Sequence, residues 1–126
     1  MVNNSFDALF DSQAENQRMM FERGMYGFVD NPEVDGKYTE LPIDEPKLAS
    51  YHIQQLVSEI GEVLDADKRW KNFRNDFYNR DAKLEELADC FIVLMNISMF
   101  SGFSADDVYN AISSKIEEVG IRISDM

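Results

Sequence analysis

The segment LEELADCFIVLMNISMF, residues 84–100, joins a pair of carboxylates to an almost wholly apolar run. Between residues 90 and 100 only Asn96 and Ser98 are polar, so a helix formed here is apolar nearly all round and must be covered on most sides. Four short helices in one chain cannot easily provide that cover. We therefore predict an all-α fold whose third helix, about residues 81–101, forms part of an interface between copies of the chain.

Two acidic pairs share the spacing of one helical turn. Glu86 and Asp89 lie three residues apart in this segment, and Glu59 and Glu62 repeat the spacing in SEIGEVLD, residues 58–65. Residues three apart lie on one face of a helix, so two such helices packed together bring four carboxylates to one place. Hard divalent ions such as Mg2+ bind oxygen ligands of this kind together with substrate phosphates. The pattern therefore predicts a metal site and phosphate chemistry.

Helical patterns account for most of the remaining chain. Apolar residues recur at helical spacing over residues 5–24, about 46–67 and about 105–119, with Gly24 and Gly102 able to end helices. In the second of these helices we predict a buried face formed by Ile53, Leu56, Val57, Ile60, Val63 and Leu64. All three prolines fall in the connection 25–47, which is longer than compact domains usually allow and is interpreted as a lid or a dimerisation arm. The length of 126 residues indicates a single domain, 1–126.

Composition excludes several classes of partner. The net charge of −12 repels a nucleic-acid backbone, and no run approaches the roughly 20 apolar residues of a membrane span. The start of the chain lacks the pattern of a secretory signal, and one cysteine, Cys90, cannot form an internal disulfide. We predict a cytoplasmic protein that binds neither a nucleic acid polymer nor a membrane. Cys90 is interpreted as a core residue and His52 as a surface or partly buried one.

Half of the basic residues gather between the two acidic pairs. They are Lys68, Arg69, Lys71, Arg74, Arg80 and Lys83. Any one of them is equally well explained as a solvated residue at a helix end, but the group favours an anionic ligand. The chain contains neither of the glycine-rich phosphate loops G-x-x-x-x-G-K-[ST] and G-x-G-x-x-G, so phosphates must be bound through metal and basic side chains.

These motifs resemble a known superfamily. E59-I-G-E62, the segment D67-K-R-W-K-N-F73, and E85-E-L-A-D89 followed by an apolar helix are similar to the all-α nucleoside triphosphate pyrophosphohydrolases, which include MazG-like enzymes and dimeric dUTPases. The likeness covers roughly residues 50–118. It implies a bundle of four to five helices assembled as a homodimer or homotetramer.

The resemblance also implies an activity. Glu59, Glu62, Glu86 and Asp89 would bind Mg2+, with Mn2+ as a substitute, and a metal-activated water would attack the α-phosphorus of a (deoxy)nucleoside triphosphate. The products would be the monophosphate and pyrophosphate, with dUTP or dCTP as the first candidates for the substrate. The further residues implied to bind substrate are Gln13, Asn16, Gln17, Trp70, Lys71, Lys83, Asn96 and Lys115. Each also has a plain structural explanation, such as a lysine stem lying over the core at Lys115.

Two departures concern base specificity. Val119 stands where MazG-like relatives often have an asparagine after the lysine that corresponds to Lys115, and Ile92 stands where dCTPase-like relatives have a histidine. Two other classes of function remain open on sequence alone. The chain would be a non-catalytic helical interaction module if its acidic surface serves a protein partner, or a nucleotide sensor if it binds without turnover.

Overall fold

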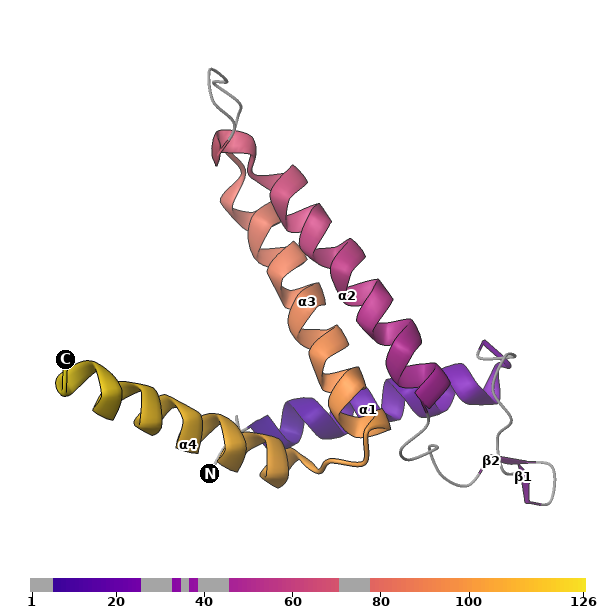
Figure 1. The fold of residues 1–126 in the computed structure, drawn as a ribbon. Coiled ribbons are helices and arrows are strands. Elements are labelled where there is room, and N and C mark those ends of the chain that lie inside the picture. Colours follow the sequence, from indigo (N-terminus) through magenta and orange to yellow (C-terminus); the bar gives the residue numbers. More distant parts are fainter. Residues whose placement is uncertain (1–5, 26–32, 35–36, 39–45, 71–77) are drawn as a thin grey trace.

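The computed structural model describes residues 6–25, 33–34, 37–38, 46–70 and 78–126, and within them the chain is largely helical (Figure 1). The elements are α1 (Phe6–Glu22), β1 (Glu33–Val34), β2 (Lys37–Tyr38), α2 (Pro46–Ala66), a 3-10 turn η1 (Lys68–Trp70), α3 (Arg80–Phe100) and α4 (Ala105–Ser124). β1 and β2 form one short antiparallel pair in which Glu33 faces Tyr38 and Val34 faces Lys37.

The predicted helices are confirmed within a few residues of their bounds. Within the connection 25–47, interpreted from sequence as a lid or a dimerisation arm, the structure describes the two-residue pair β1–β2. The remainder of that connection lies outside the described residues. α4 continues to Ser124 instead of ending near residue 119, since isoleucines keep the helical spacing through residue 123.

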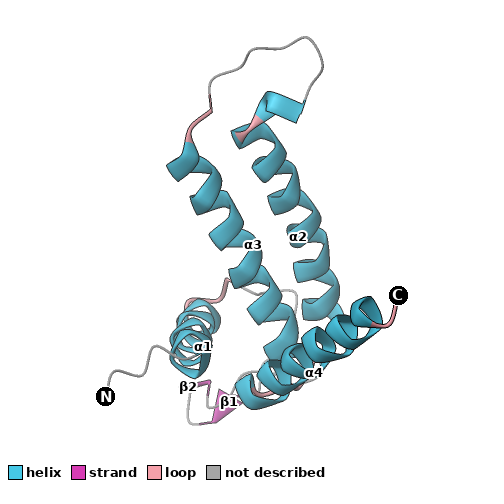
Figure 2. Cartoon of the chain, turned by 90° about the vertical axis from the view of Figure 1, so that its left-hand side faces the viewer, coloured by secondary structure: helices cyan, strands magenta, loops and turns pink. Residues whose placement is uncertain are grey.

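α2 and α3 form a hairpin that dominates the molecule, and the two helices run side by side in both views (Figures 1 and 2). Asn79 caps the start of α3, and its side chain accepts a hydrogen bond from the Ala82 N–H. Ser101 caps the end of the helix, and the following Gly102 takes a positive φ of 90° that favours glycine. The hairpin therefore holds the two acidic pairs on neighbouring helices.

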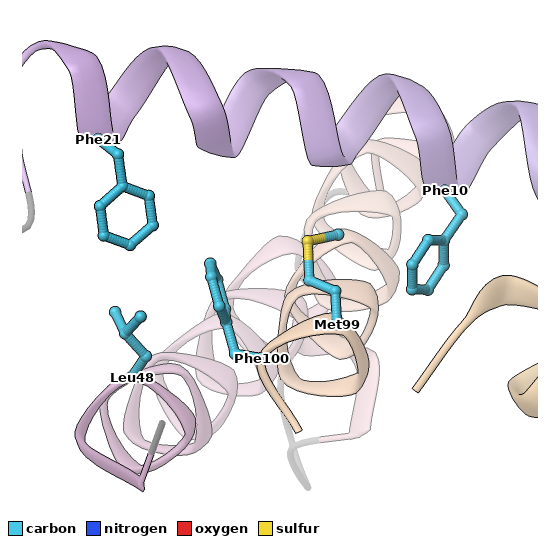
Figure 3. Close-up of a cluster of buried hydrophobic side chains, with 5 residues drawn as sticks. All are labelled: Phe10, Phe21, Leu48, Met99 and Phe100. Carbon is cyan, nitrogen blue, oxygen red and sulfur yellow. The ribbon is translucent and has the colours of Figure 1, made fainter. Parts of the chain in front are cut away.

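The hydrophobic core lies at the base of this hairpin, where α1 crosses it (Figure 1). Its buried side chains come from three helices and are Phe10, Phe21, Leu48, Met99 and Phe100 (Figure 3). Phe100 is fully buried, and its ring packs edge-on to Phe21 at 6.0 Å between centroids. Burial of one such side chain contributes about 1.5–3 kcal/mol. This cluster fixes α1 against the hairpin.

His52 belongs to this core, which corrects the prediction of a surface or partly buried residue. It is 1% exposed, and its ring stacks on Phe100 at 5.3 Å between centroids. A carbonyl oxygen can only accept a hydrogen bond, so His52 Nδ1 donates to the Leu48 carbonyl at 2.9 Å. Burial lowers the pKa of His52, while this bond acts in the opposite direction. The imidazole is therefore a structural group here.

Much of the apolar surface predicted to be buried is exposed in the single chain. On α2, Ile53, Val57 and Ile60 are each half exposed or more. α4 contains no buried residue, although its start is well formed by a capping box between Ser104 and Asp107. α4 contacts α1 near its start and then extends away from the hairpin (Figures 1 and 2). The described part of the single chain is thus a hairpin with two further helices and does not form a closed bundle.

No single helix in the described part of the chain is long and apolar enough to cross a membrane. Taken together, α3 and α4 have the length and apolar composition of a membrane-spanning segment, but the chain bends by 115° between them.

Candidate metal centre and nucleotide cleft

The four predicted carboxylates come together between α2 and α3. Each of Glu59, Glu62, Glu86 and Asp89 offers one oxygen, and these four atoms all lie within 4.8 Å of one another. Glu59 and Glu86 are partly buried, whereas Glu62 and Asp89 are exposed. The helical spacing and the pairing of α2 with α3 produce this convergence directly, because each helix presents two acidic groups on the face toward its neighbour.

The geometry fits a hard divalent cation. Opposite ligands of one such ion lie about 4–5 Å apart, since each oxygen is about 2.0–2.6 Å from the metal. The oxygens Glu59 Oε2 and Glu86 Oε2 are buried without a hydrogen-bond partner in the described part of the chain. A buried carboxylate oxygen without a partner is costly. A cation bound by all four groups would satisfy both oxygens.

Crowding of like charges perturbs the acidic groups. Burial and then the neighbouring Glu62 and Asp89 raise the pKa of Glu59. For Glu86 the close carboxyl of Glu62 is the largest cause of a raised pKa, followed by burial. Burial, reinforced by the same acidic cluster, also raises the pKa of Cys90 and keeps its thiol protonated at neutral pH. Without a cation, the centre therefore holds protons more tightly than ordinary carboxylates do.

A cleft of about 280 Å³ adjoins this centre between α1, α2 and α3, and we call it the amide cleft. It is lined by Gln13, Gln17, Met20, Tyr51, His52, Gln55, Glu59, Asp89, Ile92, Val93 and Asn96. Three predicted substrate-binding residues, Gln13, Gln17 and Asn96, thus share a cleft with two of the predicted metal ligands. All three amides are nearly buried.

The amides of this cleft are ordered by direct hydrogen bonds. Gln13 Nε2 donates to Asn96 Oδ1 at 2.9 Å, and Asn16 Nδ2 donates to Gln13 Oε1 at 3.2 Å. Asn16, the fourth amide predicted to bind substrate, therefore acts on the cleft through Gln13 and is not among the lining residues. The ordered amides can donate and accept hydrogen bonds at fixed positions, as recognition of a polar planar group requires.

Sequence reasoning missed the contribution of α2 to this cleft. Tyr51, His52 and Gln55 line it beside the predicted Glu59. A signal was present, because residues 48, 52, 55 and 59 follow the spacing of one helical face. The exposed apolar stripe that begins at Ile53 runs along a different side of the same helix. Because that stripe is the more apolar side, the sequence pattern predicted it, and not the cleft side, as the buried face.

The remaining predicted substrate residues lie elsewhere. Trp70 is 58% exposed, and its indole N–H donates to the Leu64 carbonyl at 3.2 Å. Lys83 Nζ lies 3.0 Å from Asp67 Oδ2. Lys115 is exposed on α4, 3.5 Å from Glu118, and is not among the residues lining the amide cleft. Lys71 lies outside the described residues.

A helical hairpin that clusters four carboxylates beside an amide-lined cleft defines a helical protein with a candidate divalent-metal centre. The family model described as the MazG nucleotide pyrophosphohydrolase domain matches residues 49–120, more than half of the chain. The chain belongs to this family, as the sequence motifs predicted. Comparison with curated proteins and comparison with solved structures each gave no match.

The matched region includes most of α2, all of η1 and α3, most of α4 and all four carboxylates. The family supports nucleotide pyrophosphohydrolase activity in general and implies a nucleotide substrate. α1, which supplies Gln13 and Gln17 to the amide cleft, lies outside the match.

Proposed function

We propose that this chain hydrolyses a (deoxy)nucleoside triphosphate to the monophosphate and pyrophosphate in a reaction that depends on Mg2+, with Mn2+ as a substitute. Pyrimidine deoxynucleotides, dUTP or dCTP, are the first candidates for the substrate. The observation that carries the proposal is the convergence of four carboxylates at one side of an amide-lined cleft. Two of them have buried oxygens without a hydrogen-bond partner among the described residues.

The four carboxylates and the cleft amides have different proposed roles, the first in binding the metal ion and the second in recognising the nucleoside. Glu59, Glu62, Glu86 and Asp89 would hold the divalent ion, which supplies neutralisation of phosphate charge and a more acidic bound water. Gln13 and Asn96 present ordered polar groups to the nucleoside. Because the cleft shares Glu59 and Asp89 with the metal centre, a nucleoside bound there would place its first phosphate beside the carboxylates.

The decisive experiment measures the products of a panel of nucleoside triphosphates in the presence of Mg2+, scored for pyrophosphate against phosphate. Glu62→Gln and Asp89→Asn each remove one negative charge from the centre with little change in shape, so we expect pyrophosphate release to fall at least a hundredfold while the fold is retained. Glu85→Gln is the matched control, because Glu85 neighbours Glu86 but is exposed and outside the cluster.

Several outcomes would contradict the proposal. Unchanged turnover in both Glu62→Gln and Asp89→Asn would exclude a catalytic role for the carboxylates. Binding of nucleotide without any product would instead indicate a sensor. A wild-type chain that neither turns over a nucleotide nor gains thermal stability from Mg2+ with a non-hydrolysable analogue would indicate a non-catalytic interaction module.

We also propose that the chain assembles with further copies of itself, as a homodimer or a homotetramer. Several described helices expose large apolar side chains in the single chain, among them Ile53 and Val57 of α2 and Phe91 of α3. Exposed apolar surface of this extent marks an interaction site. A second copy of the chain presents the same apolar surface and can cover it in a symmetric assembly.

α4 supplies much of this uncovered surface. Its side chains Ile112, Ile116 and Val119 are between 42% and 68% exposed. An apolar groove of about 620 Å³ runs between α4, α3 and the start of α1, and Phe91, Leu94 and Ile116 are among its lining residues. An apolar face of this extent on a projecting helix indicates an interaction site.

A further inference from the structure

One carboxylate near the tip of the hairpin, that of Asp67, forms ion pairs with two basic side chains, Arg69 and Lys83. Asp67, the residue after α2, is 7% exposed. It accepts hydrogen bonds from Arg69 Nε at 2.8 Å and Arg69 Nη2 at 2.7 Å, and Lys83 Nζ of α3 donates to the same group at 3.0 Å. Arg69 and Lys83 are thereby fixed next to each other, although they come from different sides of the hairpin.

Both cations remain accessible to a ligand. The side chains of Arg69 and Lys83 are 53% and 33% exposed, in contrast to Asp67 between them. The Arg69 guanidinium also stacks over the Tyr78 ring at 3.5 Å from its centroid, which restrains the guanidinium plane. The cluster of Asp67, Arg69 and Lys83 carries a net charge of +1, in a chain with a net charge of −12.

This cationic cluster lies one helical turn beyond the metal centre. Lys83 precedes Glu86 by three residues in α3, so the two side chains lie on the same face, about 4.5 Å apart along the helix axis. Asn96 follows Asp89 by seven residues on the opposite side of the centre, toward α1. From the tip of the hairpin to its base, α3 thus presents the cation Lys83, the carboxylates of Glu86 and Asp89, and the amide of Asn96 in that order.

We propose that Arg69 and Lys83 bind the terminal phosphates of the nucleotide, so that the substrate lies along α3 with its base toward α1 and its phosphates toward the tip of the hairpin. This inference rests on the proposed function and adds the direction in which the substrate lies. It assigns a binding role to Arg69, and it gives Asp67 the role of holding the two cations together before the ligand arrives.

A purely structural staple, meaning an ion-pair cluster that only links the two helices of the hairpin, does not explain the pairing of one carboxylate with two cations as well. One cation is enough to neutralise the buried Asp67 carboxylate, and the second adds positive charge that stays partly exposed. Arginine forms paired hydrogen bonds with phosphate oxygens, and lysine attracts the same group as a point charge. Two such cations beyond the carboxylates match a phosphate chain that extends past the bound metal.

The test is calorimetric titration of the full chain with inorganic pyrophosphate in excess Mg2+, which requires no turnover. We expect Arg69→Gln and Lys83→Gln each to raise the dissociation constant about tenfold or more, as loss of a charged hydrogen bond does. Arg80→Gln is the matched control, since it removes the same charge at the start of α3 from a side chain that is 74% exposed. The control should change the dissociation constant less than twofold.

Asp67→Asn separates a phosphate anchor from a staple. This variant removes the anion that positions the two cations but keeps both cations, so we expect lower thermal stability and a dissociation constant for pyrophosphate that rises by less than it does in Arg69→Gln. If Asp67→Asn weakens binding as much as Arg69→Gln does, the cluster is only a staple and the inference is wrong. Equal weakening by Arg80→Gln, or no pyrophosphate binding by wild type, overturns it as well.

The inference and the proposed function can fail separately. If wild type binds pyrophosphate through Arg69 and Lys83 but hydrolyses no nucleotide, the anchor stands and the hydrolase proposal falls. If wild type hydrolyses a nucleotide while Arg69→Gln and Lys83→Gln bind pyrophosphate like wild type, the hydrolase stands and the proposed direction of the substrate falls.

Discussion

Gln13 of α1 donates a buried hydrogen bond to Asn96 of α3 at 2.9 Å, across 83 positions of sequence. Asn16 in turn donates to Gln13 Oε1 at 3.2 Å, so both ends of the Gln13 amide are engaged. Sequence reasoning placed all three residues at the substrate but had no means of pairing them. The bond makes α1 part of the amide cleft, because the helix that crosses the base of the hairpin also orders the Asn96 amide.

Gln13→Ala should lower both stability and base discrimination. The substitution leaves the side-chain oxygen Asn96 Oδ1 buried without its donor, which costs about 1–3 kcal/mol. Urea denaturation of the metal-free protein measures this loss. Gln54→Ala is the matched control on α2, since Gln54 is exposed and its change should stay within about 0.5 kcal/mol. Equal stability of the two variants would show that the Gln13 bond contributes nothing measurable.

Neutralising the partly buried carboxyls of Glu59 and Glu86 should stabilise the metal-free protein at neutral pH. The raised pKa values of Glu59 and Glu86 mean that their charged forms are disfavoured in the folded chain. The double variant Glu59→Gln with Glu86→Gln removes this repulsion, so in a chelator at pH 7 we expect a higher Tm than wild type. Glu85→Gln, an exposed neighbour, should leave Tm almost unchanged.

The sign of the pH dependence follows from linkage. A carboxyl with a raised folded-state pKa binds its proton more tightly when folded, so wild type gains stability as pH falls through that pKa toward the ordinary value of 4.5. The advantage of the double variant should therefore shrink between pH 7 and pH 4.5. His52, whose lowered pKa acts in the opposite direction, is present in both proteins and cancels in the difference. A Tm difference that is independent of pH would contradict the assignment.

Phe100→Ala should detach α1 from the hairpin. Phe100 is fully buried between Phe21 and His52, and truncation of such a side chain costs about 3–5 kcal/mol. We expect a large fall in the denaturation midpoint. Phe103→Ala, three residues further along and 54% exposed, should change it little. Similar midpoints for the two variants would show that this core cluster does not hold the helices together.

The convergence of the four carboxylates was predictable from sequence because its geometry is local. Glu59 with Glu62, and Glu86 with Asp89, are each placed by the pitch of one helix, and only the pairing of two neighbouring helices is needed to join them. The helix bounds were predictable for the same reason, since apolar spacing, Gly102 and the Ser104 capping box all act within a few residues.

The residues placed less well depend on contacts between distant parts of the chain. The phosphate-binding role of Lys83 stays a prediction, but its bond to Asp67 could not be predicted, because it forms only when η1 folds back beside the start of α3. His52 is buried because Phe100 of another helix stacks on it. The Ile53 stripe of α2 was predicted to be core from periodicity alone, which identifies an apolar face but not whether the same chain covers it.

Uncovered apolar surface leads to the last prediction, which concerns α4. Ile116 is 68% exposed and lines the groove between α4, α3 and α1. Ile116→Asp places a charge on the face that we propose meets a second copy, and burying that charge is unfavourable. Light scattering after size exclusion should give a multiple of 14.6 kDa for wild type and a shift toward 14.6 kDa for the variant.

Asn110→Asp adds the same charge about 120° away around the axis of α4, since six residues turn a helix by about 600°. We expect this control to keep the wild-type mass. A wild-type chain that is monomeric at every concentration measured would contradict the proposed assembly. The apolar stripe of α4 would then need a different partner, because a helix with no buried residue gains little of the tertiary packing that stabilises most helices in proteins.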